Sequence, residues 1–185
     1  MVDTARVGGW VQSFSGAQLW PLDPRVGDFK MVVIAAGLSK ACRFNSQCLR
    51  FYCVGEHSVL MSRHAKRIGK PHLRQWCTMH DAAEHVLVDW PRPMKDEWPE
   101  YREVEKRNQM AIAEQFGLPW PMPDGVKDLD NRILLDEVRQ NMAPPQAVWT
   151  DTGATEPLGV TLQFWTPERA FYEFMLEVVD CGIKF

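Results

Sequence analysis

The sequence predicts an all-α protein whose helices are joined by long, proline-rich loops. Apolar residues recur at helical spacing in several separate segments, whereas the alternation of apolar and polar residues that is typical of strands is almost absent. The chain has 13 prolines, and many of them stand between these segments. A length of 185 residues, 45% of them hydrophobic, suits one domain with its own core, so we expect a single domain over residues 1–185.

The first half of the chain is expected to be helical after an irregular start. Residues 1–25 lack periodicity and contain WPLDPR, in which two prolines favour an extended or turning chain. Helical spacing follows in residues 29–42 and 55–69, and Asn45 and Ser46 favour a loop between them. Another helix is expected to begin at Pro71 and to lead into residues 76–90, WCTMHDAAEHVLVDW, which are also helix-like.

Helices are also expected in the second half, between loops that are rich in proline. Residues 89–101 contain too many prolines to be helical throughout. A helix is expected from about residue 104 to Phe116, ended by Gly117, and a second at 126–142, closed by Pro144 and Pro145, with a loop at 118–125 between them. Residues 146–163 are expected to be irregular, or at most strand-like around 160–164. The last helix has Thr166 as N-cap, Pro167 at its first position and Gly182 beyond its end.

Composition excludes several classes of protein. A formal net charge of −3 gives no broad basic surface, so duplex nucleic acid is not expected as a partner. No apolar run reaches the roughly 18–20 residues that span a bilayer, and no secretory signal is present, so we expect a soluble, intracellular protein. The five cysteines form no C-x-x-C pair, which argues against a disulfide framework and a thiolate zinc finger.

Three ionisable residues lie close together in the largely apolar stretch 76–90. His80 and Asp81 are adjacent, and Glu84 follows one helical turn later. Burying such groups without partners costs several kcal/mol each, so they either pair with other side chains or hold a ligand. On a helix, positions i+3 and i+4 place Glu84 on the same face as Asp81 and His80.

His57 and Asp130 could complete a metal site with His80 and Asp81. His57 lies early in another predicted helix, and Asp130 lies near the start of the helix at 126–142, with Asp128 as an alternative two residues before it. Two imidazoles and two carboxylates suit Zn, Mn, Co, Fe or Ni, and sequence does not distinguish among these ions. Such a set leaves coordination positions open, as catalytic sites do.

The order His, His-Asp, Asp across three helices resembles the HD-domain metal-dependent phosphohydrolases. Longer blocks extend the resemblance, namely FSGAQLWPLDPR, RFNSQCLRFYCVGEHSVLMSRHA, HDAAEHVLVDWPRPMK, EVEKRNQMAIAEQFGLP and VKDLDNRILLDEV. They are similar to a compact bacterial and phage branch that contains deoxynucleotide 5′-nucleotidases and phage dATP triphosphohydrolases. The resemblance implies a single HD-domain helical bundle with its core at about residues 13–142 and a C-terminal extension at 146–185.

This resemblance also implies roles for individual residues. The metal ligands would be His57, His80, Asp81 and Asp130, with Asp81 also counted as catalytic, and Glu84 would handle the attacking water. Arg43 and Lys95 would contact phosphate, although either could instead bridge carboxylates, and Phe44 and Pro93 would border the base. The sequence departs from its relatives at Ser46-Gln47, where they commonly carry Gly-His, so any contact made by that histidine is lost or replaced.

The function that this resemblance implies is hydrolysis of deoxynucleotides with one divalent transition metal, and with additional Mg on the phosphates. We expect a dNTP triphosphohydrolase acting first on dATP, releasing deoxynucleoside and triphosphate. A 5′-nucleotidase acting on deoxynucleoside monophosphates is the alternative, and a nucleotide-binding regulator without turnover is a third. Relatives in this branch are commonly oligomeric, so a dimer or hexamer in the cytoplasm of a bacterial or phage-infected cell is expected.

Overall fold

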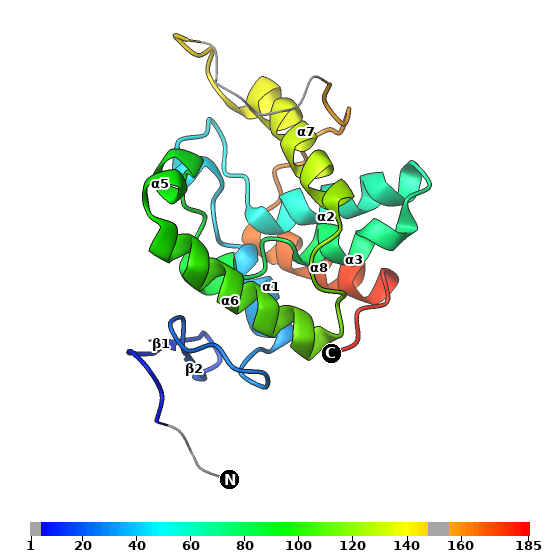
Figure 1. The fold of residues 1–185 in the computed structure, drawn as a ribbon. Helices are drawn as coiled ribbons and strands as arrows, with labels where there is room; N and C mark the ends of the chain where they lie inside the picture. The colour runs from blue at the N-terminus through cyan, green and yellow to red at the C-terminus, as the bar shows by residue number, and fades with distance from the viewer. Residues whose placement is uncertain (1–4, 148–155) are drawn as a thin grey trace.

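The computed structural model describes residues 5–147 and 156–185, which are mostly helical with negligible strand (Figure 1). The predicted all-α class is therefore confirmed. The helices are α1 (Met31–Leu38), α2 (Val54–Arg67), α3 (Arg74–Met79), α4 (Glu84–Leu87), α5 (Arg92–Glu97), α6 (Pro99–Phe116), α7 (Asp124–Asn141) and α8 (Pro167–Asp180), with 3-10 turns η1 (Phe44–Ser46) and η2 (Pro71–Leu73).

Local chemistry sets several helix ends where the sequence predicts them. The Thr166 side chain accepts a hydrogen bond from the Arg169 amide at 3.3 Å and so caps α8, which begins at Pro167. At the end of α6, Gly117 adopts a left-handed conformation with φ of 66°, which costs glycine little. The stretch at 146–163 lies partly outside the described residues, and its last part, 160–164, is not a strand.

The N-terminal segment forms a small hairpin beside the helices. Strands β1 (Val11–Gln12) and β2 (Gln18–Leu19) pair antiparallel, and Figure 1 shows them near α6 and far from α7. An Arg6–Asp28 ion pair of 2.7 Å closes this segment, and Asn108 on α6 donates to the Pro21 carbonyl at 2.8 Å. The segment is thus held by polar contacts to itself and to α6.

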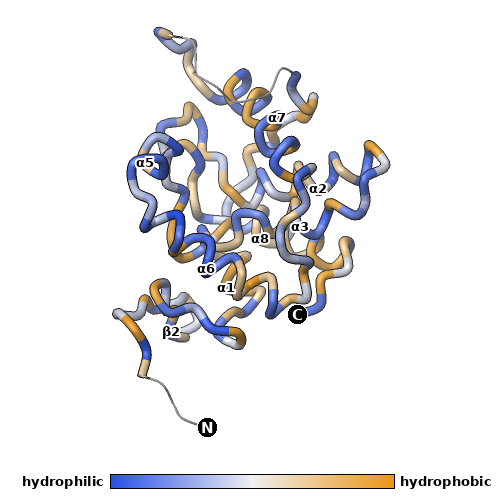
Figure 2. The backbone as a smooth tube through the Cα atoms, viewed as in Figure 1, coloured by the Kyte–Doolittle hydropathy of each residue, from blue (hydrophilic) through white to orange (hydrophobic). Residues whose placement is uncertain are grey.

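The core lies between α1, α2, α3 and α8. Its largest fully buried apolar side chains include Ile34, Leu38, Trp76 and Phe174, one or two from each helix around α2. In Figure 2 the interior helix α1 is largely hydrophobic in colour, whereas α6 is mainly hydrophilic. No helix in the described ranges is long and apolar enough to cross a membrane.

The apolar stretch 76–90 is not one helix, and here the sequence-based expectation is wrong. Helix α3 ends at Met79 and α4 begins at Glu84, with a turn between them. The side chain of Gln109, from α6, lies in the gap: its Nε2 donates to the Met79 carbonyl at 2.6 Å and its Oε1 accepts from the Ala83 amide at 3.2 Å. In a continuous helix those two backbone groups would bond to each other, so the glutamine amide replaces one helical hydrogen bond with two.

Two further boundaries also differ from expectation. Residues 89–101 are not helical throughout, as expected, but α6 begins at Pro99 and not near residue 104, and α5 precedes it. Pro91, Pro93 and Pro99 fall at helix starts, where the missing N–H is tolerated. The segment 29–42 is helical only over α1, after which the chain turns into the loop at 39–53.

We expect Gln109→Leu to lower the free energy of unfolding by about 2–3 kcal/mol, because it leaves the buried Ala83 amide without a partner and removes one of the two hydrogen bonds to the Met79 carbonyl, which keeps its bond from the Ala82 amide. Gln115→Leu, on the same helix, removes bonds to the backbone amides of Gly27, which is exposed, and of Phe29, and should cost about 1 kcal/mol. Urea denaturation of both variants checks this order. Equal stabilities would show that the amide of Gln109 does not hold the break open.

Candidate metal centre

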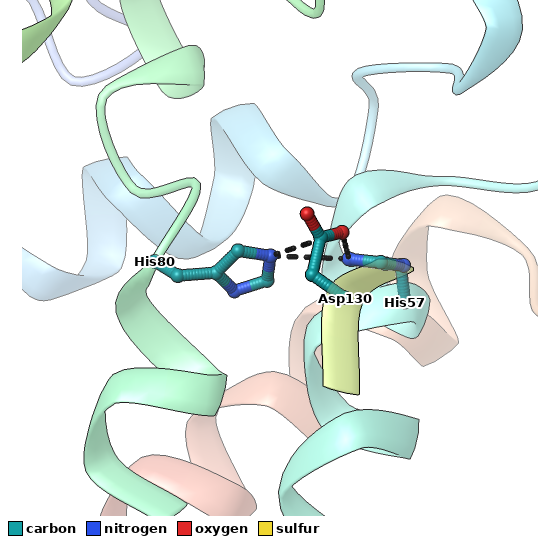
Figure 3. Close-up of side chains that lie close together, drawn as sticks. All are labelled: His57, His80 and Asp130. Atoms are coloured by element: carbon teal, nitrogen blue, oxygen red, sulfur yellow. Dashed lines mark hydrogen bonds and ion pairs between the residues drawn. The ribbon is translucent and has the colours of Figure 1, made fainter. Parts of the chain in front are cut away.

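Three side chains from separate helices converge on one point, as Figure 3 shows. His57 comes from the first turn of α2, His80 directly follows α3, and Asp130 lies in the second turn of α7. The two imidazole Nε2 atoms are 3.1 Å apart, and Oδ1 of Asp130 lies 3.4 Å from that of His57 and 3.9 Å from that of His80. These ligand atoms are close enough together to hold a metal ion.

Nδ1 of each imidazole, the ring nitrogen that faces away from the other histidine, already has a hydrogen-bond partner. Nδ1 of His57 lies 2.6 Å from a carboxylate oxygen of Glu137, and Nδ1 of His80 lies 3.0 Å from the backbone carbonyl of Cys77. An ionised carboxylate and a carbonyl can only accept, so both Nδ1 atoms must donate. When both rings are neutral, their Nε2 lone pairs therefore face each other at 3.1 Å.

Facing lone pairs need a positive charge between or beside them, and two kinds are available. A proton on one Nε2 would turn the contact into a hydrogen bond, and a metal ion would accept both lone pairs. A histidine whose other nitrogen donates to a carboxylate or a backbone carbonyl is the usual arrangement of a metal ligand. The donor set thus fits a divalent transition metal.

The surrounding charges favour a cation at this point. Burial and the charge of Arg43 act to lower the pKa of His57, yet the carboxylates of Glu137 and Asp130 outweigh them and raise it to about 9. Burial acts to raise the pKa of Asp130, but its contact with His57 and the charge of His80 hold that pKa well below its usual range. An anionic Asp130 is what a metal site requires.

The alternative ligand Asp128 points elsewhere. Its side chain is 60% exposed and lies 3.7 Å from Arg132 on the following turn. Asp130 is instead largely buried, and its second oxygen accepts a 2.6 Å hydrogen bond from Lys127. Of the two carboxylates that the sequence offered, the structure brings only Asp130 to the histidines.

Asp81 lies beside this group. Its Oδ2 is 3.2 Å from Nε2 of His80 and 3.8 Å from Nε2 of His57. Although burial acts to raise the pKa of Asp81, the neighbouring imidazoles hold that pKa far below its ordinary value. The turn opened by Gln109 therefore places a second carboxylate, held ionised, next to both imidazoles.

Glu84 begins α4 and is buried. Its Oε1 accepts from Nζ of Lys95 at 3.1 Å, and its Oε2 has no hydrogen-bond partner among the described residues. Burial, with the charges of Asp81 and Asp89, raises the pKa of Glu84 well above its usual range. Lys95 is also bound by Glu105 of α6 at 2.6 Å, so this lysine bridges two carboxylates.

Arg43 is buried and also bridges carboxylates. Its Nε and Nη2 donate to the same oxygen of Glu137 at 3.2 and 2.9 Å, and its Nη1 lies 3.7 Å from Oδ2 of Asp81. The sequence left open whether Arg43 and Lys95 contact phosphate or carboxylates. In the structure both are bound to carboxylates, and Nη1 of Arg43 makes only a long contact to Asp81.

The two residues expected at the base lie on the loops around this centre. Phe44 begins η1 in a left-handed conformation, with φ of 57°, and its ring centroid is 5.7 Å from the Arg43 guanidinium. Pro93 lies in the first turn of α5, exposed and two residues before Lys95.

Sequence reasoning missed Glu137 and Glu105. Glu137 follows Asp130 by seven residues, which is two helical turns, so helical spacing already places both on one face of α7. Glu105 belongs to a charged run at the start of α6 that is typical of a solvated helix end, and only the tertiary structure shows its bond to Lys95.

The fold and the site define a mostly helical protein with a candidate metal centre of two histidines and one aspartate, flanked by further carboxylates. The chain is 32% identical over 130 residues to the uncharacterized protein YfdR of Escherichia coli (strain K12), which covers 70% of this chain and 71% of YfdR. It therefore belongs to the same family as YfdR. No family model matches the chain.

A second relative is an uncharacterized protein of Rhodobacter capsulatus, RCAP_rcc00048. The two chains are 34% identical over 124 residues, which are 64% of this chain and 63% of that protein. The match thus spans slightly less than two thirds of each chain.

We expect metal binding at pH 7 to release about one proton per ion, because a His57 with a pKa of about 9 carries a proton before the metal displaces it. As the pH is lowered below 9, the apparent affinity for the metal should fall about tenfold for each pH unit. Above pH 9 this affinity should no longer depend on the protonation of His57. Calorimetric titration with Mn²⁺ in buffers of different ionisation enthalpy measures the protons released. Binding without proton release would contradict this account of His57.

Proposed function

We propose that this chain is an HD-domain phosphohydrolase that uses a divalent transition metal to hydrolyse deoxynucleotides. The observation that carries the proposal is the pair of imidazole Nε2 atoms that face each other at 3.1 Å beside the carboxylates of Asp130 and Asp81. The resemblance of the sequence blocks to HD-domain enzymes supports the same reading.

His57, His80 and Asp130 would hold the metal, and Asp81 would be the fourth ligand. A divalent cation in this place lowers the pKa of water from 15.7 to roughly 7–9 and polarises a phosphoryl oxygen. Four protein ligands would leave coordination positions open, and partial exposure of the Asp81 side chain, at 22%, leaves access from solvent.

Glu84 would take up the proton of the attacking water. Its Oε2 is buried without a partner, and an unsatisfied buried oxygen costs free energy unless a ligand or water uses it. Burial raises the pKa of Glu84, so its carboxyl group holds a proton more readily than an exposed glutamate does. Lys95 would hold the other oxygen, so that Glu84 keeps one orientation.

Arg43 and Lys95 would contact the phosphates. Both are held by carboxylates, and Nη1 of Arg43 is the donor most available to a ligand because, among the described residues, it makes only the 3.7 Å contact with Asp81. Asp81, Glu84 and Asp89 all lie near these cations, so the charge of a triphosphate would require additional Mg on the phosphates. Phe44 and Pro93 would border the base.

Among the substrates, we favour dATP, with water attacking the α-phosphorus and triphosphate leaving. A 5′-nucleotidase shares the same chemistry and is the second candidate. A regulator without turnover is a third, and the unpartnered Oε2 of Glu84 argues against it, because binding alone does not require a poised base. We also propose that the enzyme is a homo-oligomer, a dimer or hexamer, in the cytoplasm of a bacterial or phage-infected cell.

Product identification tests the reaction. We expect purified protein with Mn²⁺, Co²⁺ or Zn²⁺, and with Mg²⁺ added, to convert dATP into deoxyadenosine and triphosphate. Chromatography of reactions with all dNTPs, dNMPs and ribonucleotides gives the answer. Phosphate released from monophosphates alone would establish the nucleotidase, and no turnover of any nucleotide would end the proposal.

We expect Glu84→Gln to lower kcat by about 10²–10⁴-fold while the protein still binds one metal ion, since the amide cannot accept the proton of water. Asp81→Asn should lose both activity and metal. Metal analysis and kinetics of the two variants distinguish these roles, and Glu103→Gln, an exposed change on α6, is the control. Normal turnover by Glu84→Gln would remove this residue from the mechanism.

A further inference from the structure

One buried carboxylate joins the candidate metal centre to the candidate phosphate contact. We propose that Glu137 is a positioning residue that orients His57 toward the metal and Arg43 toward the substrate at the same time. The inference rests on the proposed function for its substrate half, whereas its metal half requires only that the centre binds an ion.

The geometry divides Glu137 between two partners. Oε1 lies 2.6 Å from Nδ1 of His57, and Oε2 accepts from Nη2 and Nε of Arg43 at 2.9 and 3.2 Å. Glu137 and His57 are fully buried, and Arg43 is 9% exposed, so water does not compete for these bonds. Charge-assisted hydrogen bonds of this length in a dry environment are strong and directional.

The bond to His57 decides which ring nitrogen can bind a metal. As long as Nδ1 donates to Glu137, the proton of the neutral ring is held there and the lone pair is on Nε2, which faces His80 and Asp130. Glu137 and Asp130 both lie on α7, about 10 Å apart along the helix axis for seven residues. One rigid helix thus supplies a metal ligand and also the group that orients another ligand.

The bond to Arg43 decides which donor is left for the substrate. With Nε and Nη2 bound to one oxygen of Glu137, the guanidinium is held in one plane and Nη1 is directed toward Asp81 and the metal centre. Each oxygen of Glu137 therefore serves one partner, Oε1 the imidazole and Oε2 the guanidinium. Loss of Glu137 should disturb both the metal centre and the orientation of Arg43.

A purely structural buried ion pair is the alternative, and the chain contains a matched example. Glu177 on α8 is 2% exposed and accepts from Arg74 and Ser62 at 2.6 Å each and from Arg63 at 3.2 Å. Like Glu137, it ties α2 to another helix and uses both carboxylate oxygens. It contacts none of the residues of the metal centre, so Glu177→Gln controls for lost stability.

The test compares Glu137→Gln with Glu177→Gln. An amide can still accept on one atom but cannot accept from both His57 and Arg43, so we expect the Kd for Zn²⁺, titrated against a chelating dye, to rise about 10–100-fold. Glu177→Gln should change the Kd less than threefold even if it lowers stability equally. With dATP, Glu137→Gln should raise KM as well as lower kcat, and Glu177→Gln should change neither.

Each outcome decides the inference. Wild-type Zn²⁺ affinity in folded Glu137→Gln overturns it, as does an equal loss in Glu177→Gln. If Glu137→Gln does not fold, Glu137→Asp replaces it. The shorter side chain keeps the charge but cannot reach both partners, so the affinity for Zn²⁺ should fall at least fivefold. Wild-type affinity in this variant overturns the inference. A wild-type protein that binds Zn²⁺ but hydrolyses no nucleotide would end the proposed function and leave the Zn²⁺ result to stand alone.

Discussion

The centre of this molecule depends on two imidazole nitrogens that are forced to face each other. Because Glu137 and the Cys77 carbonyl bind the outer nitrogens of His57 and His80, the inner ones lie 3.1 Å apart with their lone pairs opposed. Such a contact is repulsive unless a proton or a metal ion occupies it. The carboxylates around it, which keep His57 a strong base, therefore act to hold a cation between three helices.

This requirement explains why the polar residues are buried where they are. Asp130, Glu137 and Arg43 could not lie in a dry interior singly, but each is bound to a neighbour of opposite charge or to an imidazole. The apolar core below them, around α2, holds the backbones of α2 and α3 in place. The site is thus a connected polar network on one side of the core, in which a change at one member affects its neighbours.

The positions of the helices are predicted better by the sequence than the contacts and breaks between them. Periodicity and caps located α2, α6, α7 and α8, because Gly117, Thr166 and Pro167 act locally. His57, His80 and Asp130 were also expected as ligands, because their residue types suit a metal and because the sequence blocks resemble HD-domain enzymes. The partners of these groups were not, because the bonds of Glu137 to Arg43 and of Lys95 to Glu105 depend on which helices meet. The break after Met79 was missed for the same reason.

That break also has a consequence for how the chain folds. Local preference in residues 76–87 favours a continuous helix, and the amide that opens it belongs to Gln109, 30 residues after Met79. The local bond from the Ala82 amide to the Met79 carbonyl, at 3.0 Å, leaves the Ala83 amide without a local partner. Gln109 supplies that partner, so the break is complete only when α6 has docked against it, and such a contact carries the entropic cost of closing a loop of 30 residues. The positions of Asp81 and Glu84 beside the centre therefore depend on a contact formed far along the chain.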